Sequence, residues 1–203
     1  MNKHDSTVAI IDDDKYILDA LIELLDSIGY KSRVYSNAND FLKEYNENEI
    51  NCILLDVRMP GISGIELQHK LNDMHVTTPI IIMTGHGDIT MAVQAMKDGA
   101  FEFIEKPFRD QELLDTITKA LEMNKNNMSI QKRCKEINQR ITSLTNRERQ
   151  VVDCVLQGMS NKMIARELDV SDRTVEIHRS HAMKKMQVHS VVDLVKMMML
   201  GTD

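Results

Sequence analysis

The sequence predicts a doubly wound α/β domain built on a five-stranded parallel sheet, followed by a small all-α domain. In residues 1–122, short apolar runs alternate with segments whose apolar residues recur at helical spacing. From residue 143 onward the helical spacing continues, but no strand pattern occurs. The charge changes at the same place, because residues 1–142 contain 16 Lys and Arg against 23 Asp and Glu, whereas residues 143–203 contain 9 against 8. We therefore expect two domains with different partners.

Five strands and five helices are expected to alternate in the first domain. The expected strands occupy residues 7–12, 31–35, 52–56, 79–84 and 101–105. The expected helices occupy residues 15–28, 36–45, 63–74, 88–98 and 110–123. Such alternation is typical of an all-parallel sheet with helices on both faces. Ligands of these sheets bind beyond the carboxyl ends of the strands.

Polar side chains stand at four of those strand ends. Asp12 and Asp13 close the first strand, Asp56 the third and Thr84 the fourth, and Lys106 follows the fifth. Three carboxylates brought to one edge repel one another unless a cation compensates them. Mg²⁺ prefers such oxygen ligands, and a carboxylate beside it can attack phosphorus. A hydroxyl and an ammonium group can then hold the phosphoryl oxygens.

Four runs of residues resemble a known family. They are Ile11–Asp14, Leu55–Gly64, Met83–Gly87 and Glu105–Phe108. Together they resemble the flavodoxin-like receiver domain of two-component response regulators, and most of all the FixJ subgroup, over residues 7–122. The resemblance implies that Asp56 accepts a phosphoryl group from a phosphohistidine of a sensor histidine kinase. It also implies that the chain catalyses only phosphotransfer to, and slow loss from, its own Asp56.

The same resemblance assigns roles to the surrounding residues. The implied magnesium ligands are Asp12, Asp13, Asp56 and the backbone carbonyl of Arg58. Thr84 and Lys106 would bind the phosphoryl oxygens, and Thr84 would also act as a switch together with Phe103. The Lys106–Pro107 peptide bond is expected to be cis, a conformation that is accessible mainly before proline.

A phosphatase of the haloacid-dehalogenase type is the alternative interpretation of the first acidic run. Asp12 would then be the nucleophile and Asp14 the acid/base, with Thr84 and Lys106 as later motifs. That fold requires an acidic pair on a downstream strand, whereas the acids after Lys106 follow a helical pattern. Asp56 would also have no role, so we prefer the phosphoacceptor interpretation.

Residues 123–142 are expected to form a helical linker. They are rich in Asn, Lys, Gln and Arg and contain neither Gly nor Pro. Apolar residues recur at heptad spacing at Ile130, Cys134, Ile137, Ile141 and Leu144. A solvated helix that packs on its own domain would show this pattern, and so would a short helix that contacts a second copy.

Residues 143–203 are expected to form a helix-turn-helix domain. Thr145 and Glu148 have the spacing of a capping box, and Gly158 should end that helix. Asn161 is expected to cap a short helix, and Ser171 a longer one that reaches residue 186. A short helix, a three-residue turn and a longer helix are typical of this motif.

The C-terminal motifs resemble the LuxR-type helix-turn-helix of the FixJ/NarL class. They are Leu144–Val151, Gly158–Ala165 and Thr174–Arg179. The second helix should enter the major groove of DNA. The resemblance makes Glu176, Ile177 and Ser180 the base-reading residues. The expected phosphate contacts are Lys162, Arg173, Arg179 and Lys184.

The sequence therefore predicts a phosphorylation-activated transcriptional regulator that dimerises and binds an operator. Its expected partners are a sensor histidine kinase, double-stranded DNA, RNA polymerase and, when phosphorylated, a second copy. A polar start, the absence of a long apolar run and three dispersed cysteines favour a cytoplasmic protein that does not contact membranes. A relay protein whose helical tail binds protein instead of DNA is a further alternative.

Overall fold

The computed structural model describes residues 6–85 and 89–200. The chain forms two compact units, Met1–Asn127 and Met128–Asp203. Each unit has its own hydrophobic core, and the first unit has one on each face of its sheet. In the part of the chain that the structure describes, no helix combines the length and the apolar character that a membrane span requires.

The first unit contains the predicted five-stranded parallel sheet. Its strands are β1 (Thr7–Ile11), β2 (Lys31–Tyr35), β3 (Cys52–Asp56), β4 (Ile80–Thr84) and β5 (Glu102–Glu105). Their order is β2-β1-β3-β4-β5, and every neighbouring pair is parallel. The order reverses between β1 and β3, and ligand sites of doubly wound sheets lie at this kind of switch point.

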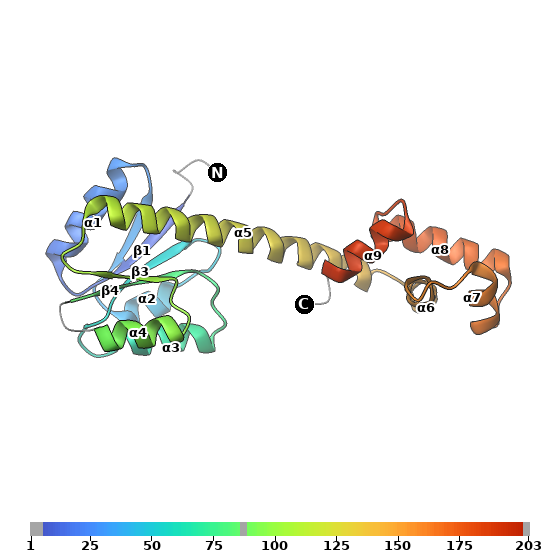
Figure 1. The fold of residues 1–203 in the computed structure, drawn as a ribbon, viewed down its shortest axis with the longest axis horizontal. Helices are drawn as coiled ribbons and strands as arrows, with labels where there is room; N and C mark the ends of the chain where they lie inside the picture. The colour runs from blue at the N-terminus through green and yellow to red at the C-terminus, as the bar shows by residue number, and fades with distance from the viewer. Residues whose placement is uncertain (1–5, 86–88, 201–203) are drawn as a thin grey trace. The chain divides into compact units, whose positions relative to one another are not determined.

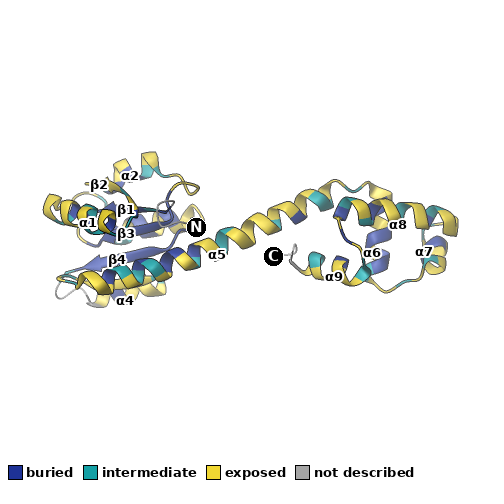
Figure 2. Ribbon diagram, turned by 90° about the horizontal axis from the view of Figure 1, so that it is seen from above, coloured by how far each residue is buried: buried dark blue, intermediate teal, exposed yellow. Residues whose placement is uncertain are grey.

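Helices cover both faces of the sheet (Figure 1). They are α1 (Lys15–Ser27), α2 (Ala38–Glu44), α3 (Gly64–Asp73), α4 (Ile89–Lys97) and α5 (Asp110–Thr142). Leu21 of α1 and Ile117 of α5 share one core, while Phe41 of α2 and Leu67 of α3 share the other. β3 and β4 are buried along their whole length, as Figure 2 shows, because both of their faces are covered. Of the helix expected over 88–98, Asp88 lies outside the described residues.

The fifth helix and the linker predicted after it form one continuous helix, α5, of 33 residues. No Gly or Pro interrupts this segment. Near its end Ile137 is buried, and Ile141 packs against the core of the second unit. Ile130, two turns earlier, is 60% exposed. The end of the apolar seam therefore packs on its own domain, whereas its beginning remains accessible.

The second unit adds four helices to the end of α5. They are α6 (Asn146–Leu156), α7 (Asn161–Glu167), α8 (Asp172–Met186) and α9 (Val191–Leu200). The capping box of Thr145 and Glu148 is present at the start of α6, as predicted. α7 and α8 form the predicted helix-turn-helix pair, and Asp169 adopts a left-handed conformation in the turn between them. Val175, Ala182 and Met186 form the buried face of α8.

The cap predicted for α7 was wrong by one residue. Ser160 has the extended backbone of an N-cap, and its side chain accepts a hydrogen bond from the backbone N–H of Met163. Asn161 is instead the first residue of the helix. Its side-chain oxygen accepts a hydrogen bond from Arg179 of α8, so it serves a contact between helices.

Candidate functional site

The three predicted carboxylates meet at the switch point of the sheet. Asp12 follows β1 and Asp56 ends β3, and carboxylate oxygens of Asp12, Asp13 and Asp56 all lie within 4.8 Å of one another. Asp12 and Asp56 are buried, whereas Asp13 is exposed. These hard oxygen donors suit Mg²⁺, and the exposed side leaves room for water and phosphate ligands.

Lys106 links two of the three carboxylates. Its Nζ lies 2.6 Å from Asp12 Oδ2 and 2.6 Å from Asp56 Oδ1. The other oxygen of Asp56, Oδ2, accepts a hydrogen bond from the backbone N–H of Arg58 at 2.7 Å. The carboxylate of Asp56 is thus held at both oxygens, and one of them faces the cationic side chain of Lys106.

Burial and charge perturb both groups of this pair. Burial raises the pKa of Asp56 above its usual 3.8, and the charge of Asp12 adds to this effect, although Lys106 opposes it. Burial alone would lower the pKa of Lys106, but its hydrogen bonds to Asp12 and Asp56 outweigh that effect and raise it. Lys106 therefore remains a cation, and for Asp56 the effect of burial exceeds the stabilisation that Lys106 gives its charged form.

The remaining residues predicted for this site occupy the neighbouring strand ends. Thr84 ends β4 and is buried, and its Oγ1 donates to the carbonyl oxygen of Gly85 at 3.2 Å. Phe103 lies on β5 and is 41% exposed. The Lys106–Pro107 bond is cis, as predicted. The motif that begins at Met83 continues into His86 and Gly87, which lie outside the described residues.

Gly64 was missed as a functional residue. A Cβ at this position would lie 2.1 Å from the backbone oxygen of Asp56. The backbone N–H of Gly64 also donates to the carbonyl oxygen of Val57 at 3.0 Å. Only glycine permits this close approach, so Gly64 fixes the loop that carries Asp56. The sequence signal was a glycine directly after the Ser63 cap.

An apolar groove adjoins the acidic site and was not predicted. It has a volume of about 490 Å³ and lies beside Lys106. Its lining includes Tyr16, Ile17, Ala20, Leu24 and Phe108. Tyr16 is 88% exposed, so a large aromatic side chain stands unpacked at the edge of the site.

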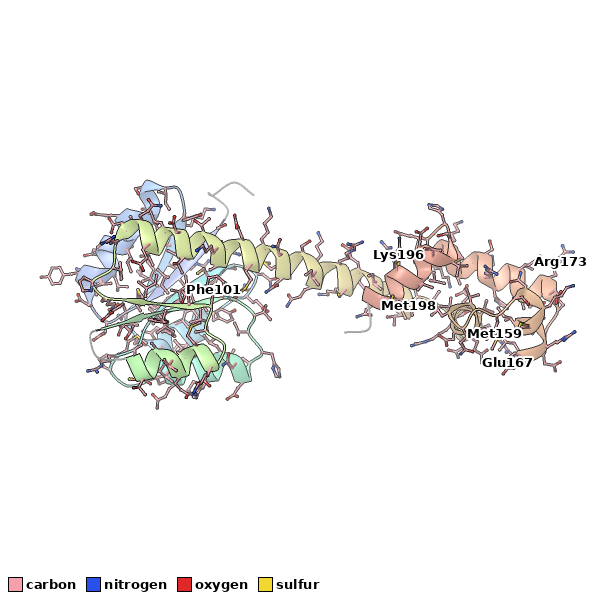
Figure 3. All side chains as sticks on the ribbon, in the orientation of Figure 1. Phe101, Met159, Glu167, Arg173, Lys196 and Met198 are labelled. Carbon is pink, nitrogen blue, oxygen red and sulfur yellow. The ribbon has the colours of Figure 1, made fainter. Side chains whose placement is uncertain are left out.

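The exposed face of α8 carries the predicted base-reading residues. Glu176, Ile177 and Ser180 are exposed, as is Lys184. Figure 3 shows Arg173 at the first turn of α8, where it is also exposed. Lys162 is exposed near the start of α7.

Arg179 differs from the other predicted phosphate contacts. It is half-buried, and its Nη1 donates to Asn161 Oδ1 at 2.7 Å. One of its donors is therefore engaged in holding α8 against α7.

Asp14 does not occupy the place that the phosphatase interpretation requires. It is the N-cap of α1, and its Oδ1 accepts a hydrogen bond from the backbone N–H of Tyr16 at 2.8 Å. Asp56, which that interpretation leaves without a role, lies next to Asp12. The geometry thus favours Asp56 as the reactive carboxylate.

Two families match this chain. Residues 8–118 match the family described as response regulator receiver domain, and residues 142–198 match the bacterial regulatory proteins of the luxR family. The chain is a two-component response regulator. In this response regulator, the acidic site therefore belongs to a receiver domain, and α8 belongs to a LuxR-type DNA-binding domain. The phosphatase interpretation is excluded.

Relatives of this response regulator match over nearly the whole chain. The response regulator protein TmoT of Ectopseudomonas mendocina is 44% identical over 97% of this chain and 89% of its own length. The transcriptional regulatory protein FixJ of Bradyrhizobium diazoefficiens is 42% identical over 95% and 94%. Among solved structures, the response regulator StyR matches with a TM-score of 0.90 and 40% identity, covering 96% of this chain and 98% of that one. Full-length FixJ from B. japonicum matches with a TM-score of 0.59 and 41% identity, covering 97% of each chain. The response regulator thus belongs with transcriptional regulators that share both of its domains.

Proposed function

We propose that phosphorylation of Asp56 by a sensor histidine kinase controls how this response regulator binds DNA. The observation that carries the proposal is the position of Asp56, with one oxygen held by a backbone N–H and the other facing Lys106. Asp12, Asp13, Asp56 and the backbone carbonyl of Arg58 would hold Mg²⁺. When bound, Mg²⁺ neutralises charge on the phosphoryl oxygens.

The residues of the chain would then perform a simple exchange. An oxygen of Asp56 forms a bond to phosphorus while the bond between phosphorus and the kinase histidine breaks. Lys106 moves its hydrogen bond from Asp56 Oδ1 to a phosphoryl oxygen, and Thr84 turns its hydroxyl from Gly85 to another. Thr84 and Phe103 would report this change to the surface of the domain. The only substrate carboxylate is the chain's own Asp56.

We assign the apolar groove beside Lys106 to the kinase. Any donor must bring a phosphohistidine to Asp56, so it must cover the surface that surrounds the site. Exposed Tyr16 and the apolar groove lined by Ala20 and Phe108 form an apolar surface that such a partner could cover. Ala20→Glu should slow phosphotransfer from the kinase while leaving phosphorylation by acetyl phosphate unchanged.

The output would be operator binding by a cytoplasmic dimer that contacts RNA polymerase. Exposed apolar side chains on α4 and β5 support a contact with a second copy, and they are Met91, Val93, Met96 and Phe103. In this proposal the receiver domain spans 1–122, the helical linker 123–142 and the DNA-binding domain 143–203.

The decisive experiment compares Asp56→Asn with Asp14→Asn. Asp56→Asn should accept no phosphoryl group from acetyl phosphate, as measured by intact-protein mass. Beryllofluoride, which mimics a phosphoryl group, should raise the DNA affinity of the wild type but leave that of Asp56→Asn unchanged. Asp14→Asn alters only the cap of α1 and should behave as the wild type. A normal yield of acid-labile phosphate on Asp56→Asn would refute the assignment.

A further inference from the structure

The ends of α5 and α8 are joined by two reciprocal hydrogen bonds within the second unit. Arg140, in the last turn of α5, donates from Nη1 to the carbonyl oxygen of Met186, the last residue of α8, at 3.3 Å. In return Lys185 of α8 donates from Nζ to the carbonyl oxygen of Ser143, directly after α5, at 3.2 Å. Each cation thus satisfies a free carbonyl at the end of the other helix, where a positive charge is favourable.

Lys185 also reaches the start of α6. Its Nζ lies 2.6 Å from Glu148 Oε2, and the same oxygen accepts the backbone N–H of Thr145 at 2.8 Å. Glu148 is only 4% exposed, and its hydrogen bond with Lys185 lowers its pKa below the usual 4.5. A buried carboxylate needs such a partner. The ammonium group of Lys185 is therefore bound by groups of its own domain, although its side chain remains 37% exposed. The side chain of its neighbour Lys184 is exposed.

The two hydrogen bonds made by Arg140 and Lys185, which we call the joint, are bordered both by apolar packing and by a cleft. Ile141 and Leu144 pack against the core that contains Met186. On the other side a cleft of about 450 Å³ separates α5 from the segment that joins α8 to α9, bordered by Arg133, Ile137, Arg140, Val188 and Lys196. Figure 3 marks Lys196 on α9. The hydrogen bonds of Arg140 and Lys185 therefore hold the two helix ends together beside the apolar packing of Ile141 and Leu144.

We propose that Arg140 and Lys185 are positioning residues that couple α5 to the recognition helix α8. α5 begins at Asp110, shortly after Lys106, and continues without a break to Thr142. A change at the phosphorylation site that displaces α5 then alters how α8 is held. This inference rests on the proposed control of DNA binding by phosphorylation, and it names the residues through which that control passes.

The test measures the DNA affinity of the full chain with and without beryllofluoride. Lys185→Gln and Arg140→Gln should each reduce the ratio of the two affinities at least threefold, toward one. In this proposal both cations act within the protein, so the salt dependence of DNA binding of these variants should remain that of the wild type. Lys184→Gln should lower both affinities alike and preserve the ratio, while its salt slope falls by roughly 0.9. Arg133 borders the cleft but does not form the hydrogen bonds between α5 and α8, so Arg133→Gln should preserve the ratio.

Rescue separates positioning from simple loss of stability. Lys185→Arg keeps a cation that can donate and should restore the ratio, with far-UV circular dichroism confirming the fold of every variant. If Lys185→Gln fails to fold, Arg140→Gln decides, because it leaves the pair of Glu148 and Lys185 intact. A wild-type ratio in folded Arg140→Gln, or in folded Lys185→Gln, overturns the inference. If beryllofluoride leaves the DNA affinity of the wild-type protein unchanged, the proposed function is overturned instead.

Discussion

Lys106 is the cation that joins two carboxylates of the acidic site. It touches Asp12 and Asp56 at the same distance, so it replaces part of the charge that a metal ion would otherwise supply. Burial nevertheless raises the pKa of Asp56, because desolvation of its carboxylate outweighs the stabilisation that Lys106 gives the charged form. Lys106 would therefore compete electrostatically with a Mg²⁺ ion in the unphosphorylated protein, although both would assist the proposed phosphotransfer.

Replacing Lys106 by Gln should tighten the binding of Mg²⁺ to the unphosphorylated protein. The change removes a positive charge beside two carboxylates, and we expect an increase in affinity of roughly three- to tenfold. The same variant should lose most of its phosphorylation by acetyl phosphate, because a phosphoryl ligand is missing. Isothermal titration with MgCl₂ measures the first effect. Lys119→Gln, exposed on α5, is the matched control, and weaker Mg²⁺ binding by Lys106→Gln would contradict the argument.

At the scale of the elements, local sequence predicted most helix starts and few contacts between helices. Ser63 and Glu66 form a capping box, as Thr145 and Glu148 do, and such caps depend on residues three positions apart. The bond between Arg179 and Asn161 joins residues 18 positions apart, and that between Lys185 and Glu148 joins residues 37 apart. Each depends on the packing of α8 against another helix, which no local pattern contains.

The site was predictable for a different reason. Strand ends of a parallel sheet converge, so Asp12 and Asp56 could be placed together before the fold was known. The role of Gly64 was not predictable in this way, because it depends on how close a Cβ at this position would come to the backbone of Asp56. The sequence also does not reveal that one donor of Arg179 is engaged by Asn161, while its phosphate contact stays a prediction.

The ion pair at the start of α6 should make the free energy of unfolding of the DNA-binding unit depend on pH. The folded protein holds the pKa of Glu148 below 4.5, so its ion pair stabilises the fold fully at pH 7. This contribution is lost as the pH falls below 4.5 and through the depressed value. Glu148→Gln should cost about 1–3 kcal/mol at pH 7, and the difference from the wild type should shrink below pH 4. Urea unfolding followed by circular dichroism measures both. A difference that stays constant with pH would refute the role of the ion pair.

Substitutions on the exposed face of α8 should distinguish base recognition from contacts with the phosphate backbone. Lys184→Ala would remove a predicted phosphate contact, so it should weaken binding to all DNA sequences alike and lower the salt slope by roughly 0.9. Glu176→Ala should instead change the preferred base at one position of each half-site by about 1–3 kcal/mol, with little effect on the slope. A base-by-base affinity profile with a salt titration measures both. If only Lys184→Ala changes the base preference, the assumed docking of this helix is wrong.

Over the whole molecule, the added negative charge of a phosphoryl group would by itself oppose DNA binding. Residues 1–127 contain 12 Lys and Arg against 22 Asp and Glu, whereas residues 128–203 contain 13 against 9. The first unit therefore repels DNA while the second attracts it, and a phosphoryl group adds further negative charge to the first. Phosphorylation must then act through structure. A dimer would bring two basic units to one operator and offset the repulsion.

The final prediction concerns that dimer. Met96 of α4 and Phe103 of β5 are exposed apolar side chains. In a two-fold symmetric dimer through this surface, both side chains of each subunit would be buried, so every residue occurs twice in the interface. Met96→Glu should therefore place two charges in the interface and weaken dimerisation by at least about tenfold, which corresponds to roughly 1.4 kcal/mol. Light scattering at micromolar concentrations should show a doubled mass for the wild type in beryllofluoride and a monomer for Met96→Glu. Met74→Glu, an exposed methionine at the end of α3, should dimerise normally, and all three proteins should accept phosphate at Asp56 equally. If wild-type mass is the same with and without beryllofluoride, activation proceeds within one chain, and the joint between α5 and α8 would have to account for all of it.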